Sequence, residues 1–599
     1  LTHDLDPYFP KDTTVVYESS NENIVKIDDY GNVTAVAEGF ASVTVKVMMD
    51  GKNTFYSESV SVEVKDPYIT NGASLTHYFG NGGLVVVPDD KSLTEIGNFA
   101  FANFEYVPKT EEELAFDDAD TSKQWFIGEN SITKVILPEG IKKIGAYAFA
   151  NLTALEEIVL PSTLESIEYG AFYGCSALQK ITFSNGNNLK IISQSAFEGC
   201  DLQDTVDLSA ICVISNYAFA GNQDLKGITT SDSLLSIGEY AFAGCKSLET
   251  VTITAPKVKY APYAFTGCEA LTSFYVNASV LPEGMFYECK KLKSVTIGSD
   301  VNDIGVFAFR DTAVEIFEIS KDNKSFKAYN QNIILNKKGD TLVAVSPEIS
   351  GEFTSKHLDG EEVEKIYKGA FSHNQKLTAV TLEQVTEVGD YSLASNTGLK
   401  TVKLGTLKEI GEYAFIESAL VNVDLSAVET IGEYAFVSNK ALTDITVNPN
   451  GVQIDEGAFS ECNALKNVKN MAGIQNVGDY AFAYTAIVDA DLSGAEHVGD
   501  QAFLKRELTP FTVKLGENLQ TLGDNPFALC DVAPFGVDLN APEETEATEE
   551  VAEIAEEEPA ETEAVEETAE TAETEEAEAE PGAQAAGLPD TDKSNIEAD

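Results

Sequence analysis

One alternation of apolar and polar residues recurs along most of this chain. Residues 234–253, LLSIGEYAFAGCKSLETVTI, contain it in full. Val251 and Ile253 alternate with threonines there, which is typical of a short strand with one buried face. Phe242 and Leu248 supply a second buried line on the returning stretch. The pattern predicts a chain that turns back on itself within about twenty residues and repeats.

The phenylalanine of this motif returns at intervals that are mostly 21 to 25 residues long. It stands at Phe101, Phe149, Phe172, Phe197, Phe219, Phe242, Phe265, Phe286, Phe309, Phe371, Phe415, Phe436, Phe459, Phe482, Phe503 and Phe527, and Leu393 takes its place once. These positions define about 17 units. One unit cannot bury its own apolar face, but stacked units can, and their strands then form a parallel sheet. Glycines such as Gly238 allow a tight turn or a close backbone approach in each unit.

Two intervals are much longer and predict inserts, near residues 105–130 and 320–360. The first contains the acidic run Glu111–Asp120 and the only tryptophan, Trp125. The second contains Ile333–Val345, two β-rich runs around a Lys-Gly-Asp turn, which predicts a hairpin. We expect the array to start at Leu84–Val87, with an atypical first unit as a cap.

Outside the array, the two ends of the chain differ in character. Residues 1–66 read as short strands separated by turn signals, which predicts a small β-sandwich. Residues 541–599 hold 23 acidic residues and one lysine, and residues 541–580 contain 19 Glu without any Lys, Arg or aromatic residue. Such a segment cannot bury a core and is predicted to be a disordered, extended tail. The fold class is therefore mainly β, with a sandwich at 1–66, a solenoid at 67–540 and a tail at 541–599.

Two resemblances rest on these stretches. Residues 17–45, with the Ser19-Ser20-Asn21 turn and Gly31-x-Val33-Thr34-Ala35, resemble the bacterial Ig-like domain of group 2. That family has further strands before this point, so the resemblance implies a domain truncated at Leu1. The repeat, in which residues 143–149 read KIGAYAF and residues 155–161 read LEEIVLP, is similar to the BspA-like leucine-rich repeats of bacterial surface proteins. This second resemblance implies a secreted or surface-attached protein that acts in adhesion.

The residue three positions after the phenylalanine is usually small. It is Cys seven times, and seven of the eight cysteines in the chain occupy this slot. Asn, Thr or Ser fill most of the others. We predict a ladder of reduced, structural side chains that fit a narrow turn or bond a loop carbonyl. The alternative, a disulfide or a reactive thiol, would need a neighbour that lowers the thiol pKa.

Catalytic and cofactor motifs are absent from the sequence. It has no GxSxG, HExxH or GxxxxGK[ST] pattern, its five histidines are scattered, and we expect no enzyme activity, metal or cofactor. The acidic run Glu111–Asp120 lacks EF-hand spacing and reads as a solvated loop rather than a calcium site. A net charge of −58 argues against a nucleic-acid partner, and no apolar run is long enough to span a membrane. Near the end, Leu588–Asp592 is similar to the sortase motif LPxTG, but Asp592 replaces its glycine, so a sorting signal, a trimmed relic and a chance match all stay open.

The candidate binding face is the outward side of the repeat strands, together with the inserts. Its members are Thr250, Thr252, Ser273, Tyr275, Ser294, Thr296 and Trp125. The first hypothesis is a non-enzymatic surface or secreted bacterial protein that binds an extracellular host or neighbouring-cell protein or glycan. The alternatives are an accessory region of a larger extracellular carbohydrate-active enzyme and a structural envelope protein. A sheet face that contacts only solvent would carry the same small polar residues, so binding through this face is a hypothesis.

Overall fold

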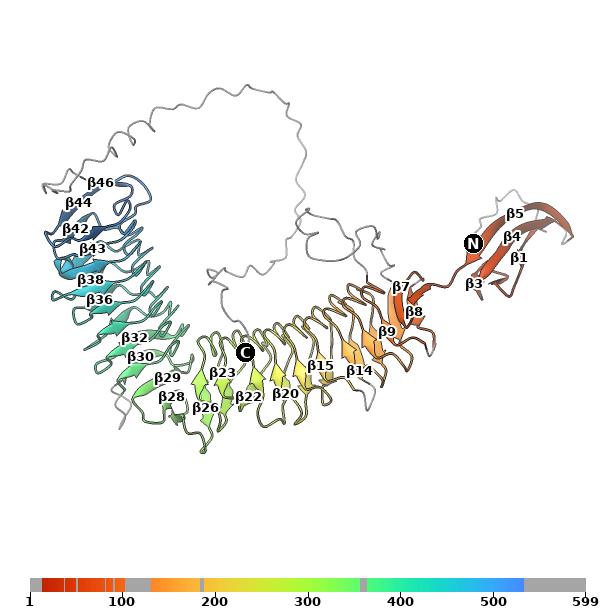
Figure 1. Ribbon diagram of the computed structural model, residues 1–599, viewed down its shortest axis with the longest axis horizontal. Helices are drawn as coiled ribbons and strands as arrows, with labels where there is room; N and C mark the ends of the chain where they lie inside the picture. The colour runs from red at the N-terminus through yellow and green to blue at the C-terminus, as the bar shows by residue number, and fades with distance from the viewer. Residues whose placement is uncertain are drawn as a thin grey trace, which may run out of the picture. The chain divides into compact units, whose positions relative to one another are not determined.

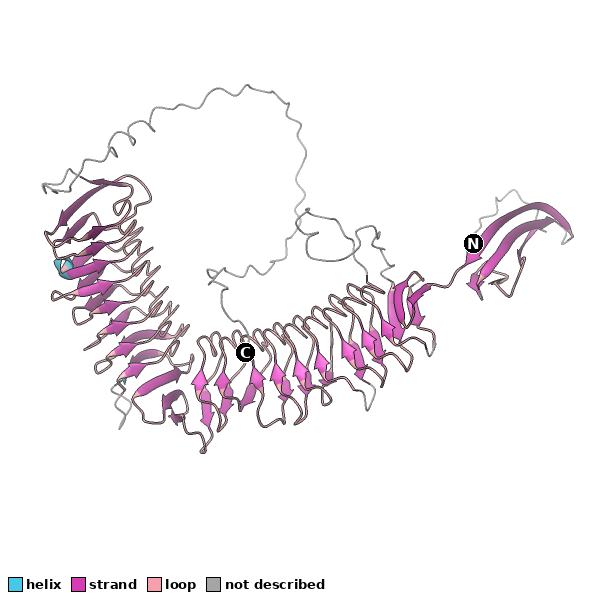
Figure 2. Ribbon diagram, viewed as in Figure 1, coloured by secondary structure: helices cyan, strands magenta, loops and turns pink. Residues whose placement is uncertain are grey.

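The computed structural model describes residues 13–36, 38–49, 52–80, 82–89, 92–102, 131–183, 188–355 and 363–532. Within these ranges, the regular structure is β-strand except for the 3₁₀ turn η3 (Met471–Gly473), as Figure 2 shows. The mainly β fold class predicted from the sequence is therefore confirmed. The predicted tail, the acidic run 111–120 and Trp125 lie outside the described residues.

The first five strands form a small sandwich. β1 (Thr13–Ser19), β4 (Gly39–Met49) and β5 (Asn53–Val64) make an antiparallel sheet in the order β1-β4-β5, and β2 (Val25–Ile27) pairs with β3 (Val33–Ala35). Val25 of the β2–β3 hairpin packs on Ala41 and Val43 of the sheet, which form a small core of their own. Alternation of buried and wetter residues along β4 matches the alternation in its sequence.

The described part of the repeat array opens with an antiparallel hairpin. β6 (Tyr68–Asn71) and β7 (Ser74–Tyr78) form an antiparallel hairpin, and β7 then pairs in parallel with β9 (Glu95–Ile96). The stretch predicted as the start, at Leu84–Val87, holds β8 (Gly83–Val86), whose partner is the next strand of the same face. The antiparallel hairpin covers the open end of a parallel array, which is the role expected of a cap.

Each unit contributes one longer strand to a front face, and among the described residues these strands pair in parallel within five successive hydrogen-bonded sheets. The front strands are β8, β10 (Ile132–Ile136), β12 (Glu157–Leu160), β14 (Lys180–Phe183), β16 (Thr205–Asp207), β18 (Gly227–Thr229), β20 (Thr250–Thr252), β22 (Ser273–Val276), β24 (Ser294–Ile297), β26 (Ile316–Ile319), β30 (Gly351–Thr354), β32 (Leu377–Thr381), β34 (Thr401–Lys403), β36 (Asn422–Leu425), β38 (Asp444–Val447), β40 (Asn467–Lys469), β42 (Asp489–Leu492), β44 (Thr509–Leu515) and β46 (Cys530–Val532). Figure 1 shows these strands stacked one after another, which confirms the predicted parallel sheet.

A second row of short strands, mostly two residues long, runs behind the front face. They are β9, β11 (Lys143–Ile144), β13 (Ser166–Ile167), β15 (Ile191–Ile192), β17 (Val213–Ile214), β19 (Ser236–Ile237), β21 (Lys259–Tyr260), β23 (Val280–Leu281), β25 (Asp303–Ile304), β29 (Thr341–Val345), β31 (Lys365–Ile366), β33 (Glu387–Val388), β35 (Glu409–Ile410), β37 (Thr430–Ile431), β39 (Val452–Ile454), β41 (Ile474–Val477), β43 (His497–Val498) and β45 (Thr521–Leu522). The second residue of most of these strands, such as Ile144, Ile167 and Ile237, is buried, so the apolar residue before the motif glycine is part of a strand.

Between the two rows, each unit makes a tight turn, and the stacked turns form what we call the turn ridge. Its residues run from the motif glycine to three positions past the phenylalanine. A Cβ atom at Gly238 would lie 2.5 Å from the backbone nitrogen of Asn216, so the predicted close approach is real. The residue two positions before the phenylalanine has a positive φ even when it is not glycine, as in Tyr240 (φ 52). The ridge thus holds left-handed backbone once per unit at this position.

The interior is a stack of the motif phenylalanines. Phe149 and Phe172, for example, lie parallel with ring centroids 5.0 Å apart. In many units the small residue three positions after the phenylalanine donates a hydrogen bond to a carbonyl oxygen of the stack. Cys245 Sγ donates to Phe219 O at 3.3 Å, and Asn222 Nδ2 donates to a phenylalanine oxygen one turn earlier at 2.8 Å. Carbonyl bonding, one of the two roles predicted for this slot, is therefore observed.

The second insert is itself part of the array. β27 (Phe326–Tyr329), β28 (Ile333–Asn336) and β29 form an antiparallel sheet, which confirms the hairpin predicted at Ile333–Val345, and β29 pairs in parallel with β31. Alternate residues of this hairpin face different interiors: Ile334 and Ala344 pack with the units before it, and Leu335 and Leu342 with the units after it. The insert therefore divides the apolar interior into two clusters.

Candidate functional site

Four of the predicted binding residues share one sheet. β22, β24 and β26 pair so that Tyr275, Thr296 and Glu318 lie in one cross-strand row, and Ser273, Ser294 and Ile316 in the next. We call these six residues the strand face. Tyr275 is 56% exposed and Ile316 is 36% exposed, while the alternate residues of the same strands, such as Phe274, are buried. Thr296 Oγ1 donates to Glu318 Oε2 at 2.8 Å, so the row is ordered by a hydrogen bond.

Thr250 and Thr252 lie outside this sheet. Both are exposed on β20, which pairs with β18 and β16, and no described strand pairing links β20 to β22. The two threonines therefore continue the outward side of the array, but they belong to a different hydrogen-bonded sheet from Tyr275.

Front strands of the later units carry charges that neighbouring side chains already satisfy. Asn467 Nδ2 donates to Asp444 Oδ1 at 2.7 Å, and the bonds from Thr443 and Asn467 lower the pKa of Asp444. Lys514 Nζ lies 3.2 Å from Asp491 Oδ2. A partner would have to displace these internal bonds, whereas Tyr275 and Ile316 present apolar surface that is already in water.

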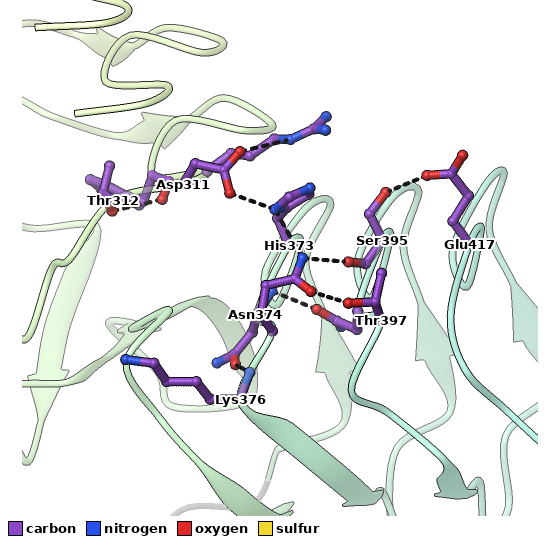
Figure 3. Close-up of polar contacts among 12 residues, drawn as sticks. Asp311, Thr312, His373, Asn374, Lys376, Ser395, Thr397 and Glu417 are labelled. Atoms are coloured by element: carbon purple, nitrogen blue, oxygen red, sulfur yellow. Dashed lines mark hydrogen bonds and ion pairs between the residues drawn. The ribbon is translucent and has the colours of Figure 1, made fainter. Parts of the chain in front are cut away.

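The turn ridge has an irregular step in its described part, which we call the seam. It separates the turn 304–312 from the turn 366–374, and the hairpin insert lies between these turns in the sequence. Figure 3 shows Asp311 reaching from the first turn to His373 of the second, with 2.7 Å between Asp311 Oδ1 and His373 Nδ1. Tyr367 Oη donates to Asp303 Oδ1 at 2.8 Å across the same step. Side chains therefore bridge the two turns.

Elsewhere in the ridge, backbone bonds make this link. At every other step between the turns of Phe149 and Phe527, three N–H groups of one turn donate to three carbonyls of the next. The step before the seam has Gly284 to Val306 (3.1 Å), Phe286 to Ala308 (3.2 Å) and Glu288 to Arg310 (3.0 Å). At the seam all three are missing among the described residues, and the oxygen of Ala370, which Phe309 N would otherwise reach, accepts instead from Val345 N of the insert at 2.9 Å.

The repeats of this chain match a known family of leucine-rich repeats. The family model for the BspA-type leucine-rich-repeat region matches residues 119–213, 212–332, 356–443 and 429–540, which is more than half of the chain. The chain belongs to the BspA-type leucine-rich-repeat family. The model for the bacterial Ig-like domain of group 2 matches residues 1–55, in agreement with the resemblance of that stretch. No curated protein matches the chain.

Several solved structures resemble this BspA-type array. A leucine-rich cell surface protein from Faecalibacterium prausnitzii is 21% identical, covers 68% of this chain and 93% of its own, and has a TM-score of 0.42. A leucine-rich-repeat protein from Bacteroides ovatus is 21% identical over 72% of this chain and 94% of its own, with a TM-score of 0.38. The pneumococcal vaccine antigen PcpA is 16% identical over 79% of this chain and 96% of its own, with a TM-score of 0.35.

The BspA-type array also exposes an apolar strip that the sequence reasoning missed. Val86 of β8, Ile136 of β10 and Val159 of β12 lie in one cross-strand row, and Val86 is 54% exposed. Leu84 stands exposed on the same strand as Val86. The run Leu84–Val87 could have predicted this strip, because a strand with one buried face and four consecutive apolar residues must have some of them facing outward.

Stacked tyrosines on the turn ridge were missed as well. Tyr217, Tyr240 and Tyr263 lie parallel, with ring centroids 5.1 and 5.0 Å apart. The set Tyr391, Tyr413 and Tyr434 repeats this in later units at 4.9 and 5.2 Å. The rings are half-buried, and burial is the main cause that raises the pKa of each phenol that shifts, to about 12 in Tyr391. These rings support each other, so they contribute to ridge stability and leave their edges to solvent.

No reactive constellation forms among the described residues. His77, His373 and His497 lie in different units, and the described part of the chain holds no group of three or more metal-ligating side chains. All eight cysteines are free, and burial raises the pKa of Cys245 to about 12, so its thiol stays protonated. No helix among the described residues is long and apolar enough to cross a bilayer.

Proposed function

We propose that this chain is a non-enzymatic bacterial surface or secreted protein that binds an extracellular protein or glycan of a host or neighbouring cell through the strand face. The observation that carries the proposal is the exposed pair of rows on β22, β24 and β26, in which Tyr275 and Ile316 stand in water beside the Thr296–Glu318 hydrogen bond. Support also comes from the family, since a similar solved structure is described as a leucine-rich cell surface protein.

The physical argument rests on what an interface needs. Hot spots are enriched in tyrosine, tryptophan and arginine, and they sit among contacts that exclude water. Tyr275 is the aromatic residue of the strand face, and its neighbours Ser273, Ser294 and Thr296 are small enough to let a partner surface approach. Phe274, Val295 and Phe317 of these strands are buried and hold the sheet in place, so little ordering entropy is lost on this side when a partner binds.

The test is a comparison of two exposed tyrosines in the full-length protein. Saturable binding is measured on immobilised extracellular-matrix proteins, on glycan arrays and on host cells. We expect Tyr275→Ala to weaken the binding roughly tenfold to thirtyfold, since a hot-spot tyrosine contributes about 2 kcal/mol. Tyr30→Ala is the control, because Tyr30 is more exposed (84%) but lies in the sandwich. Equal binding by both variants would exclude the strand face, and no saturable binding to any ligand class would count against adhesion itself.

A further inference from the structure

The seam contains a small, partly open cavity of about 20 Å³ beside the step where the backbone bonds between turns are missing. Its walls come from the first turn, at Phe307, Phe309 and Arg310, from the insert, and from the second turn, at Lys368 and Ser372. A volume of roughly 10–15 Å³ admits one water-sized particle, so this cavity has room for one small ion but not for a side chain.

Hydrogen-bond donors without acceptors surround this space. The N–H groups of Phe307 and Phe309 make no hydrogen bond among the described residues, because the carbonyls that receive the equivalent groups elsewhere are displaced or occupied here. Arg310 Nε is also buried and has no hydrogen-bond partner. Arg310 Nε is the donor of the three that is shown to be buried, and buried polar groups are almost always bonded, so this donor lacks an acceptor at hydrogen-bond distance.

The charges of the walls indicate which acceptor fits. Arg310 and Lys368 are the charged residues that line the cavity, in a protein with a net charge of −58. Two carboxylates lie behind them: Asp311 Oδ2 is 3.9 Å from Arg310 Nε, and Asp303 Oδ2 is 3.8 Å from Lys368 Nζ. These carboxylates hold the cations in place but do not line the cavity, and backbone N–H groups with a nearby cation are a common setting for bound anions.

We propose that the seam cavity binds one small inorganic anion of chloride size. The anion accepts hydrogen bonds from the orphaned N–H groups and from Arg310, and so takes the place of the carbonyl row that is missing at this step. It links the turn 304–312 to the turn 366–374, where no backbone ladder does. This inference is independent of the strand face and of its ligand.

Bromide is the direct probe, because it replaces chloride and scatters anomalously. Crystals of the full-length protein soaked in sodium bromide should show an anomalous peak inside the cavity, within hydrogen-bond distance of Phe309 N and Arg310. A featureless cavity, or one that holds only a water molecule, would overturn the proposal.

A second experiment measures the effect in solution. Thermal unfolding is followed while chloride replaces gluconate at constant ionic strength, since gluconate is too large for the cavity. The midpoint should rise by roughly 1–2 °C with chloride, because a ligand that binds only the folded state stabilises it. Arg310→Gln should weaken the apparent chloride affinity roughly tenfold, the effect expected for loss of one charged hydrogen bond.

The chain contains only one other arginine, which supplies the matched control. Arg506 stacks on Tyr484 and forms an ion pair with Glu461 at a regular step of the ridge, so Arg506→Gln should leave the chloride response unchanged. Arg310→Lys keeps the charge and should keep most of the response, which covers the case that Arg310→Gln fails to fold. A chloride response that is absent in the wild type, or equal in Arg310→Gln and Arg506→Gln, would refute the site.

Discussion

Replacing Gly284 by alanine should destabilise the array far more than the same change at Gly199. Both glycines are in left-handed backbone, with φ of 56 and 68, and both lie on the turn ridge. An added Cβ at Gly284 would stand 2.1 Å from Cε1 of Tyr263, whose ring covers that glycine. At Gly199 the nearest heavy atom would be 3.7 Å away, which is an ordinary contact.

The two costs can be separated. A left-handed alanine costs about 1–2 kcal/mol, and about 0.4–1 kcal/mol returns because alanine restricts the unfolded chain. Gly199→Ala should therefore cost between about 0 and 1.6 kcal/mol. Gly284→Ala must in addition displace the Tyr263 ring, whose hydroxyl donates to Glu283 at 2.6 Å, so a further loss of about 1–3 kcal/mol is expected.

Urea unfolding of the full-length protein, followed by far-ultraviolet circular dichroism, measures both variants through the shift of the midpoint. The double variant Tyr263→Ala/Gly284→Ala removes the ring and should lose less than the sum of its single changes, because the clash is then gone. Equal losses for the two glycine variants, or strict additivity in the double variant, would refute the steric argument.

Three further predictions concern the small residues that stand three positions after the motif phenylalanine. Asn439→Ala should cost about 2–4 kcal/mol in urea unfolding, because Asn439 Nδ2 donates to the buried carbonyls of Phe415 (2.7 Å) and Phe436 (2.9 Å), while Asn439→Cys should cost less than half as much. In thiol labelling of the native protein, Cys212 should react faster than Cys245, which is fully buried; equal rates would contradict the reduced structural role. Burial raises the pKa of Cys245 from 9.0 to about 12, so the stability that it contributes is present below pH 9 and falls as the pH rises towards 12. The decline of the urea midpoint between pH 9 and 10.5 should be shallower in Cys245→Ala, and an identical decline would contradict the assignment.

The front strands and the interior could be read from the sequence because their signals are periodic. Alternation at Val251 and Ile253 identified the inward residues, and the recurrence of the phenylalanine set the unit length. The residues between the inward ones must face outward, so Ser273 and Tyr275 could be named from the sequence. Their register with Ile316 and Glu318 could not be predicted, because it depends on how successive units align.

The second row of strands and the ridge geometry were beyond this reasoning. A strand of two residues such as β19 is too short to show a period, so Ile237 was assigned to a motif rather than to a sheet. Tyrosine in left-handed backbone is unusual, and the local sequence around Tyr240 does not predict it. The one indication is that some units have glycine and others tyrosine two positions before the phenylalanine. The strand β29 belongs to a unit without the motif, so its place in the array could not be deduced from repetition.

The seam also has a mechanical meaning. In a repeat array, each unit gains most of its stability from its nearest neighbours, so cooperativity passes along the chain step by step. At the seam the backbone ladder stops, the hairpin insert packs on both apolar clusters, and side-chain bonds such as Asp311–His373 add to the link. A tensile load along the array would concentrate on that link, and the units on either side would part as two blocks before any block unravels. The longest interval between repeats thus marks the weakest joint of the array.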